Sequence, residues 1–291
     1  MSQFAGKTAV ISGGAEGIGL SIATALANEK MNVVIADIDP NNLQKAEQTL
    51  LDLGAQVLAL PLDVASEGQW QTVAEKTLER FGKVHMVVNN AGVGGEVGAV
   101  EHNNAKGWQW TLDVNLMGVV YGAKTMVPLM KEQQEGGWIV NVASMAGMGG
   151  VPFAGAYTAT KTAVVSLTEA WAVELAPFGI AVSALCPAFV QTRIHESYRN
   201  RQAQYQTDKK PSSSQSAAAS KAKQAVENGI DVSIVGKRVV EALNDKELYI
   251  FTHPNYRPVT QKRAKLIDEA FERATKSPLL QHILEQKIEM L

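Results

Sequence analysis

The chain has 291 residues, of which 46% are hydrophobic, and a formal net charge of −2 at pH 7. This length and composition suit a soluble enzyme whose core fits one α/β domain. A charge so close to neutral gives no reason to expect nucleic acid or an anionic membrane as a partner. The single cysteine, Cys186, excludes an intrachain disulfide and suits a reducing compartment. We interpret it as a small apolar residue at the end of a buried strand.

No stretch of the sequence is apolar enough to span a bilayer, and the N-terminus lacks the apolar core of a signal peptide. We therefore expect a cytoplasmic protein with no membrane partner. The five histidines form no close pair of the kind that binds a metal ion, so we expect no metal site.

The N-terminal segment predicts a nucleotide-binding turn. The buried run from Lys7 to Ser12 is typical of a strand, and an apolar helical pattern follows from Leu20 to Leu26. Gly13, Gly17 and Gly19 lie between them. Glycine has no Cβ, which allows a tight turn and lets the backbone approach a pyrophosphate at the positive end of a helix. The alternative is an ordinary loop between strand and helix.

The next predicted strand, Asn32 to Ala36, ends in Asp37. A carboxylate at this distance can accept hydrogen bonds from an adenosine ribose, and it repels a 2′-phosphate. The glycine turn also carries Glu16 where a basic residue would pair with such a phosphate. Both acids favour NAD over NADP as the cofactor. The alternative is that Asp37 only begins the turn at Asp39 and caps the next helix.

Strand and helix patterns alternate along the rest of the chain. This alternation predicts an α/β fold with a doubly wound parallel sheet in a single domain, helices on both faces, and ligands beyond the carboxyl ends of the strands. The predicted helices cover residues 41–53, 67–81, 108–131, a segment carrying Tyr157, and 231–243; the predicted strands cover residues 56–60, 84–88, 138–142, 180–185 and 248–251.

Tyr157 and Lys161 are the most informative pair in the sequence. Residues four apart lie on the same face of a helix, so the phenol and the ammonium project together. A fixed positive charge lowers the pKa of a phenol, which would let Tyr157 exchange a proton with an alcohol near neutral pH. Ser144 supplies a hydroxyl that could bind the same oxygen. Taken singly, these residues could also be a half-buried helix face, a solvated charge and a turn at a strand end.

Together these residues resemble the short-chain dehydrogenase/reductase family. The resemblance covers about Lys7 to Thr192 and implies a Rossmann-type sheet. It depends on seven segments in the expected order, which are the turn from Ser12 to Gly19, Asp63-Val64, the run Asn89-Asn90-Ala91-Gly92, Asn115, Ser144, the Tyr157/Lys161 pair and the run from Pro187 to Thr192.

The resemblance implies a role for each matching residue. The catalytic group would be Asn115, Ser144, Tyr157 and Lys161, with Asn115 placed to hold a water that carries the proton onward. Asp63 and Val64 would flank the adenine, and Val190 with Thr192 would hold the nicotinamide carboxamide. The full predicted set of NAD contacts is Gly13, Glu16, Gly17, Ile18, Gly19, Asp37, Ile38, Asp63, Val64, Asn90, Ala91, Gly92, Tyr157, Lys161, Pro187, Val190 and Thr192.

Two positions depart from the family pattern. Ser12 stands where the family usually has threonine, which preserves a hydroxyl. Ala188 follows Pro187 where glycine is usual, which narrows the backbone freedom beside the expected nicotinamide site. Neither change removes a reacting group.

After Thr192 the sequence becomes polar. We expect residues 194–228 to form a substrate lid or mobile insertion, with Ile194 to Tyr205 as the better lid candidate and the low-complexity run from Lys209 to Ser220 as a mobile segment. Arg199 and Arg201 are expected to be solvated, the alternative being a contact with an acidic substituent of the substrate. Residues 255–291 are predicted to form a helical extension, with a charged amphipathic helix over about 259–275 and a short helix after Pro278.

The expected function is oxidation of a secondary alcohol, or reduction of a ketone, with NAD as cofactor. An NAD-dependent isomerase or dehydratase that recycles its cofactor and a non-catalytic NAD sensor remain as alternatives. The expected substrate is bulky and mainly apolar or aromatic, because the residues around it are apolar. The lid and the C-terminal segment are loosely similar to the branch with dehydrogenases of benzylic alcohols from lignin. The candidate substrate contacts are Met145, Phe153, Phe189, Ile194 and Tyr198.

The helices predicted over residues 108–131 and 155–176 carry more apolar surface than one buried face needs. In the family, the matching helices pair across a twofold axis. We therefore expect a homodimer or, in preference, a homotetramer.

Overall fold

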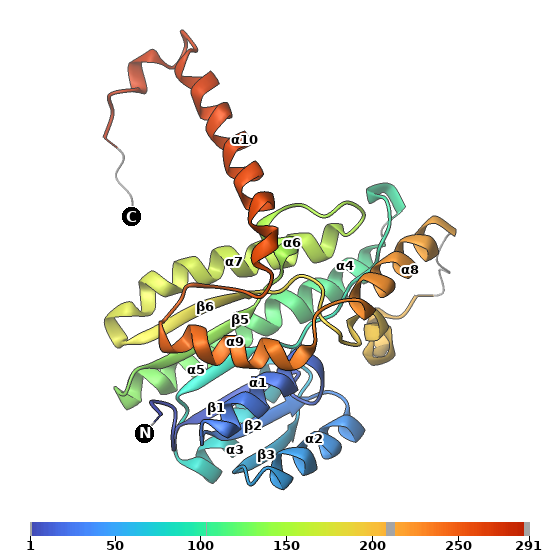
Figure 1. The fold of residues 1–291 in the computed structure, drawn as a ribbon, viewed down its shortest axis with the longest axis vertical. Coiled ribbons are helices and arrows are strands. Elements are labelled where there is room, and N and C mark those ends of the chain that lie inside the picture. Colours follow the sequence, from blue (N-terminus) through green and yellow to red (C-terminus); the bar gives the residue numbers. More distant parts are fainter. Residues whose placement is uncertain (1, 103, 208–212, 288–291) are drawn as a thin grey trace. The chain divides into compact units, whose positions relative to one another are not determined.

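A computed structural model describes residues 2–102, 104–207 and 213–287. Its centre is a seven-stranded sheet in the order β3-β2-β1-β4-β5-β6-β7, and every neighbouring pair of strands is parallel (Figure 1). The predicted doubly wound α/β fold is therefore confirmed. The strands are β1 (Thr8–Ser12), β2 (Asn32–Asp37), β3 (Val57–Pro61), β4 (Met86–Asn89), β5 (Gly137–Val142), β6 (Ile180–Cys186) and β7 (Tyr249–Phe251).

Both faces of the sheet are buried. Successive residues of a strand point to opposite faces, so each strand contributes side chains to both. In β1, Ala9 and Ile11 pack into one apolar cluster, whereas Val10, between them, packs into the other. The first cluster contains residues of α1 (Gly17–Asn28), α2 (Pro40–Asp52) and α9 (Val232–Asn244). The second contains residues of α3 (Glu67–Phe81), α4 (Ala105–Leu112), α5 (Gly118–Gln133) and α7 (Gly155–Leu175). These continuous apolar strands are typical of a sheet covered on both sides.

The chain reverses its winding between β1 and β4, which are neighbours in the sheet although β2 and β3 separate them in sequence. Loops that leave the carboxyl ends of such a pair diverge to opposite faces, and the crevice between them is where open α/β sheets bind ligands. The glycine turn follows β1, and the run from Asn90 to Gly92 follows β4. The topology thus brings two predicted cofactor segments together.

One prediction about helices needs correction. Residues 108–131 do not form one regular helix, because a π-type turn, η2 (Asp113–Met117), separates α4 from α5. Within the run from Lys209 to Ser220, α8 (Ser213–Glu227) begins; residues 209–212 lie outside the described residues. Alanine, glutamine and lysine are good helix formers, which agrees with a helix in this low-complexity run. The mobility expected of this run stays a prediction.

The segment after β6 continues through two short 3₁₀ turns, η4 (Ile194–Asn200) and η5 (Ala203–Tyr205). Ser197, Arg201 and Tyr205 in these turns are buried. We call residues 193–206 the strap. Its contacts with the cofactor segments are described below.

The chain divides into two compact units, Met1–Thr252 and His253–Leu291. The second unit contains α10 (Arg257–Thr275), which extends the amphipathic helix predicted over 259–275 by two residues at its start. The short helix predicted after Pro278 is replaced by a 3₁₀ turn at Gln281–Ile283. None of the described helices is long and apolar enough to cross a membrane.

Close packing of α9 on α1 depends on Gly236. A Cβ at this position would lie 2.2 Å from the carbonyl oxygen of Ser21 in α1, and the Gly236 N–H donates to the Ser21 hydroxyl at 3.0 Å. Alanine is the better helix former, but here it would push the two helices apart.

We expect Gly236→Ala to lower the free energy of unfolding by about 1–3 kcal/mol, because the strain of overpacking outweighs the gain in helix propensity. Denaturant unfolding of purified protein measures this change. Gly68→Ala in α3 is the matched control, since a Cβ there meets nothing within 4 Å. Equal stability of the two variants would show that the helices separate without cost.

Candidate active site

The glycine turn after β1 has the backbone shape that its sequence predicts. Gly13 and Gly17 have φ values of +60° and +56°, in the left-handed region that favours glycine. A Cβ at Gly19 would lie 2.1 Å from the carbonyl oxygen of Gly13, so this position excludes any side chain. The first turn of α1 therefore lies directly against the loop and leaves its N-terminal N–H groups toward the crevice.

Ser12 and Asn90 join this turn to the loop after β4. The Ser12 hydroxyl accepts hydrogen bonds from the backbone N–H groups of Asn90 at 3.0 Å and Ala91 at 3.2 Å. The Asn90 side chain donates to the carbonyl oxygens of Ser12 and Gly13, both at 2.9 Å. Serine thus supplies the hydroxyl that the family usually takes from threonine.

Asp37 lies at the end of β2, beside the glycine turn. Its carboxylate accepts hydrogen bonds from the backbone N–H of Ala15 at 3.1 Å and of Asp39 at 3.0 Å. Burial raises the pKa of Asp37, and these two N–H donors partly offset the effect. The carboxylate is thus held in one orientation next to the turn where a ribose is expected. The alternative role, as the cap of α2, belongs to Asp39, which accepts from the N–H groups of Asn41 and Asn42.

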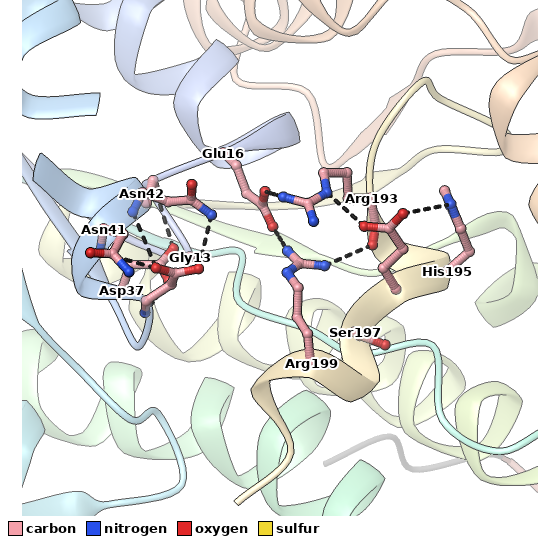
Figure 2. A network of polar contacts seen from close by, with 12 residues as sticks. Gly13, Glu16, Asp37, Asn41, Asn42, Arg193, His195, Ser197 and Arg199 are labelled. Carbon is pink, nitrogen blue, oxygen red and sulfur yellow. Dashed lines mark hydrogen bonds and ion pairs between the residues drawn. The ribbon is translucent and has the colours of Figure 1, made fainter. Parts of the chain in front are cut away.

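Glu16 does not lie free in the turn. Figure 2 shows its carboxylate pointing toward the guanidinium groups of Arg193 and Arg199, which belong to the strap. Arg193 lies 3.6 Å from Glu16, and Arg199 forms the second ion pair. Arg193 is also bonded to Glu196 at 2.7 Å. Because two cations already neutralise Glu16, repulsion of a 2′-phosphate at this end of the site depends mainly on Asp37.

At the adenine end of the expected site, the strap contacts Asp63. The Asp63 carboxylate accepts from the side chain of Gln202 at 2.8 Å and from the backbone N–H of Ala65 at 3.0 Å. The neighbouring Val64 is buried, whereas Ile38 is exposed at the end of β2. The strap therefore touches both ends of the crevice, the glycine turn through Arg199 and the loop after β3 through Gln202.

The structure places Tyr157, Ser144 and Lys161 together beyond β5. Ser144 follows β5 and caps the short helix α6 (Met145–Met148), where its hydroxyl accepts from the N–H of Ala146 at 3.1 Å. The same hydroxyl is hydrogen-bonded to Tyr157. The Lys161 ammonium donates to the carbonyl oxygen of Val142 at 2.8 Å and lies 5.7 Å from the centroid of the Tyr157 ring.

Burial controls the protonation of this group. Lys161 is 3% exposed, and burial lowers its pKa from 10.5 to about 8. Burial also raises the pKa of Tyr157, and the hydrogen bond with Ser144 offsets only part of this shift. The expected lowering of the tyrosine pKa by Lys161 is therefore not found, because desolvation of the phenolate dominates. The interpretation of Lys161 as a solvated charge is wrong.

Asn115 lies in the π-type turn η2 and is fully buried. Its side-chain oxygen accepts from the N–H of Val93 at 2.7 Å, and its side-chain nitrogen donates to the carbonyl of Val93 at 2.9 Å. A Cβ on Gly92 would lie 3.3 Å from the Asn115 oxygen and 3.4 Å from the Lys161 ammonium. Asn115 thus fixes the loop after β4 beside Lys161, and its amide is already committed to Val93.

The loop after β6 brings the expected nicotinamide contacts toward the same crevice. The Pro187 carbonyl accepts from the N–H of Met145 at 2.9 Å and from the Ser144 hydroxyl at 3.4 Å. A Cβ on Gly17 would lie 3.4 Å from the Thr192 side chain, so Thr192 faces the glycine turn. Ala188 is not among the residues with positive φ, so alanine fits this loop without strain. Cys186 is buried at the end of β6, as predicted.

The candidate substrate residues differ in their surroundings. Met145 is buried, whereas Phe153, Phe189 and Tyr198 are exposed and Ile194 is partly buried. A shallow hollow of about 330 Å³ includes Phe153 but none of the other four.

Arg201 is the main surprise in this region. It was expected to be solvated, but its side chain is 3% exposed and forms an ion pair with the nearly buried Glu96 at 3.1 Å. No local pattern in the sequence distinguishes Arg201 from Arg199. The burial follows from tertiary packing of the strap against α4 and the loop after β4.

The fold and this arrangement are those of a dinucleotide-dependent oxidoreductase. A family model described as short chain dehydrogenase matches residues 7–203. The chain belongs to the short-chain dehydrogenase/reductase family, and it is an enzyme that acts on CH–OH groups with NAD as its cofactor.

Individual relatives cover almost the whole chain. A "CLA biosynthesis dehydrogenase/reductase" of Lactiplantibacillus plantarum is 37% identical over 92% of this chain and 95% of its own length. A "C alpha-dehydrogenase" of Sphingobium sp. (strain NBRC 103272 / SYK-6) is 29% identical over 92% of this chain and 87% of its own, and agrees with the branch suggested by the sequence. A solved short-chain dehydrogenase/reductase from Burkholderia phymatum in complex with NAD is 38% identical, with a TM-score of 0.90 over 93% of this chain and 97% of its own.

We expect kcat/KM with NAD to exceed that with NADP by at least about tenfold, the value of one unfavourable charge contact. Asp37→Ser should reduce this preference, because it removes the carboxylate that faces the ribose. Glu16→Gln is the matched control and should reduce it less, since Glu16 is already paired with two arginines. Initial rates with both cofactors measure the ratio, and equal efficiency of the wild type with both would refute the expectation.

Burial of Lys161 has a consequence for stability. Its folded pKa of about 8 lies below the unfolded value of 10.5, so between these pH values the unfolded chain binds the extra proton. Stability of the wild type therefore rises with pH from about 8 to 10.5 from this group, and the full penalty applies below pH 8.

We expect Lys161→Met to unfold with a free energy about 1–3 kcal/mol larger than the wild type at pH 7, after allowance for the lost bond to Val142. The difference should shrink toward pH 10.5. Denaturant unfolding at both pH values measures it, with Lys45→Met, at an exposed position of α2, as a control for losing a lysine. A destabilised Lys161→Met variant at pH 7 would contradict the desolvation argument.

Proposed function

We propose that this enzyme interconverts a secondary alcohol and a ketone on a bulky, mainly apolar or aromatic substrate, with Tyr157 as the general acid and base. The observation that carries the proposal is the convergence of the Tyr157 phenol, the Ser144 hydroxyl and the Lys161 ammonium beyond β5, beside the loop from Pro187 to Thr192.

The glycine turn, Asp37, and the loops after β3, β4 and β6 would hold NAD. Close approach at Gly13, Gly17 and Gly19 and the oriented carboxylate of Asp37 fit a dinucleotide. Bound NAD supplies the hydride acceptor. Everything else in the reaction is proton transfer and positioning by this chain.

In the proposed reaction, the substrate oxygen lies between the Ser144 and Tyr157 hydroxyls. Tyr157 accepts the alcohol proton as the carbonyl forms, and Ser144 donates a hydrogen bond to the same oxygen. Since the pKa of Lys161 is about 8, its ammonium form predominates at pH 7 and stabilises the phenolate when it appears. Asn115 positions the loop after β4 against Lys161 through its two bonds to Val93.

An apolar substrate is supported by the residues around this group. Met145, Phe189 and Ile194 carry no charge and follow β5 or β6 directly. The names of the two relatives, a "CLA biosynthesis dehydrogenase/reductase" and a "C alpha-dehydrogenase", agree with a dehydrogenase that acts on a CH–OH group. We propose an apolar substrate for this enzyme.

We further propose that the strap is the substrate lid. Its hydrogen bonds reach the loop after β4 at two points, from the N–H of Gly94 to Ser197 at 3.0 Å and from Tyr198 to the carbonyl of Gly95 at 3.5 Å. Arg199 and Gln202 tie it to the glycine turn and to Asp63. Opening of the strap would require the loss of these polar contacts.

Self-association is part of the proposal. In α7, Val173 is 76% exposed, and Phe178 just beyond its end is 45% exposed. We expect a homotetramer or homodimer that covers this face. Light scattering at micromolar concentration measures the mass, and a monomer would refute the expectation.

The test of the function is Tyr157→Phe. We expect it to reduce kcat by at least about a hundredfold, because only the proton-transfer group is lost. Turnover is followed by NADH absorbance over a panel of secondary alcohols and ketones, and NADH binding by fluorescence titration should remain close to that of the wild type. Tyr121→Phe, in α5, is the matched control. Substantial activity of Tyr157→Phe would assign proton transfer to another group.

A further inference from the structure

Arg201 lies in the most unusual environment of the strap. One guanidinium nitrogen, Nη1, donates to the Glu96 carboxylate at 3.1 Å. The guanidinium carbon lies 5.0 Å from the centroid of the Trp110 ring and 5.4 Å from that of the Tyr198 ring. The two rings are themselves 5.5 Å apart. Arg201 is thus enclosed by one carboxylate and two aromatic rings.

The other edge of this guanidinium is unsatisfied. Nε and Nη2 are both buried, and neither has a hydrogen-bond partner among the described residues. Aromatic rings interact with the face of a guanidinium but accept no conventional hydrogen bond in its plane. Buried N–H donors on a cation are costly when unpaired, and such groups in a folded protein indicate a missing partner. The Nε and Nη2 atoms form the edge that binds a carboxylate through two parallel hydrogen bonds.

The unsatisfied edge is next to the candidate active site. Glu96 is four residues after Gly92, whose Cα is flanked by Asn115 and Lys161. Ser197 and Tyr198, which precede Arg201 in the strap, are bonded to Gly94 and Gly95 of the same loop. Arg201 is therefore bonded, through Glu96, to the loop after β4, and Gly92 of that loop lies beside Lys161.

Tyr198 is the movable neighbour of this guanidinium. Its side chain is 47% exposed although its ring packs on Trp110 and Arg201. Its hydroxyl has one long hydrogen bond, at 3.5 Å, to the carbonyl of Gly95. Rotation of an exposed side chain with one weak polar contact costs little, whereas Trp110 is fully buried and donates to Gln202 at 3.1 Å.

We propose that Arg201 binds a carboxylate of the substrate through its Nε and Nη2 atoms after the Tyr198 ring has moved aside. The inference rests on the proposed alcohol–ketone reaction and specifies its substrate as a mainly apolar molecule that carries a carboxylate. Arginine has five N–H donors, so one guanidinium can bind Glu96 on one side and a second carboxylate on the other. A dianionic phosphate fits less well, because Glu96 already neutralises the cation.

The length of the loop limits the spacing of the two groups. From Gly92 to Glu96 the chain can extend at most about 14 Å, at about 3.5 Å per residue. This value is an upper limit, so the spacing between the alcohol and the acid group of the substrate is found from the series of hydroxy acids in the test below.

The test uses paired substrates that differ only in the acid group. Hydroxydecanoic acids with the hydroxyl at successive carbons are compared with their methyl esters, with NADH formation as the readout. The wild type should prefer the best acid over its ester by about tenfold in kcat/KM, the value of a charge-assisted pair of hydrogen bonds. The ester also tests the proposed function independently: turnover of the ester without preference for the acid refutes only the inference, and no turnover of any neutral alcohol refutes the function.

The variants remove the pair of donors Nε and Nη2 without leaving Glu96 as an unpaired buried charge. Arg201→Gln combined with Glu96→Gln keeps a neutral hydrogen-bonding pair, and it should abolish the preference for acids mainly through KM while esters react as before. Arg201→Lys keeps the positive charge but lacks the two parallel N–H donors. It should lose most of the preference for acids over esters. Lys45→Gln, which removes a positive charge from an exposed position of α2, is the matched control and should keep the acid-to-ester ratio within about twofold. An unchanged acid-to-ester ratio in the double variant would show that Arg201 only stabilises the fold.

Binding without turnover gives a second readout. Decanoic acid, which has no alcohol to oxidise, should bind the NADH-loaded wild type in calorimetry and lose at least about tenfold in affinity in the double variant. Circular dichroism and the melting temperature of the double variant verify its fold. Equal affinity of wild type and double variant for decanoic acid would overturn the proposal.

Discussion

The pairing of β1 with β4 is the constraint on which the rest of the structure depends. These strands are neighbours although two strands separate them in sequence, so the loops that follow them diverge and leave a crevice at the carboxyl edge. Ser12 and Asn90 close the base of this crevice with four hydrogen bonds from one loop to the other. The other contacts of the site depend on how this junction positions the two loops. Examples are the approach of Gly92 to Lys161 and of Gly17 to Thr192.

The site is built from polar groups that are expensive to bury. Lys161 is held by the carbonyl of Val142, and Asn115 by both backbone groups of Val93. Each bond offsets part of the desolvation penalty, but the lowered pKa of Lys161 shows that the penalty is not fully compensated. Such uncompensated groups are typical of functional sites, where stability is lost in exchange for reactivity. Arg201 belongs to the same class, because two of its three guanidinium nitrogens have no hydrogen-bond partner among the described residues.

The strap is joined to the loops around the crevice by polar contacts as well as by buried side chains. Glu16 in the glycine turn is bound by Arg193 and Arg199, and Asp63 is bound by Gln202. Tyr205 belongs to the apolar cluster that includes Trp110, and the Tyr198 ring packs on Trp110. Polar contacts are exchanged readily for contacts with a ligand, since water or the ligand can replace each partner. In the proposed lid, closure of the strap and occupation of the crevice would be linked through these polar side chains.

The sequence by itself determined the sheet, its covering layers of helices and the family to which the chain belongs. Apolar strand runs, glycines at 13, 17 and 19, and the spacing of Tyr157 and Lys161 are local signals, because period, turn chemistry and helical rise act over a few residues. Tertiary structure decided what depends on burial: the raised pKa of Tyr157, the break of the helix at Asn115, the pairing of Glu16 with two arginines and the enclosure of Arg201. Arg199 and Arg201 look alike in the sequence, yet one reaches Glu16 at the surface and the other is buried against Trp110. Desolvation depends on atoms brought together from distant parts of the chain, and no local pattern carries that information.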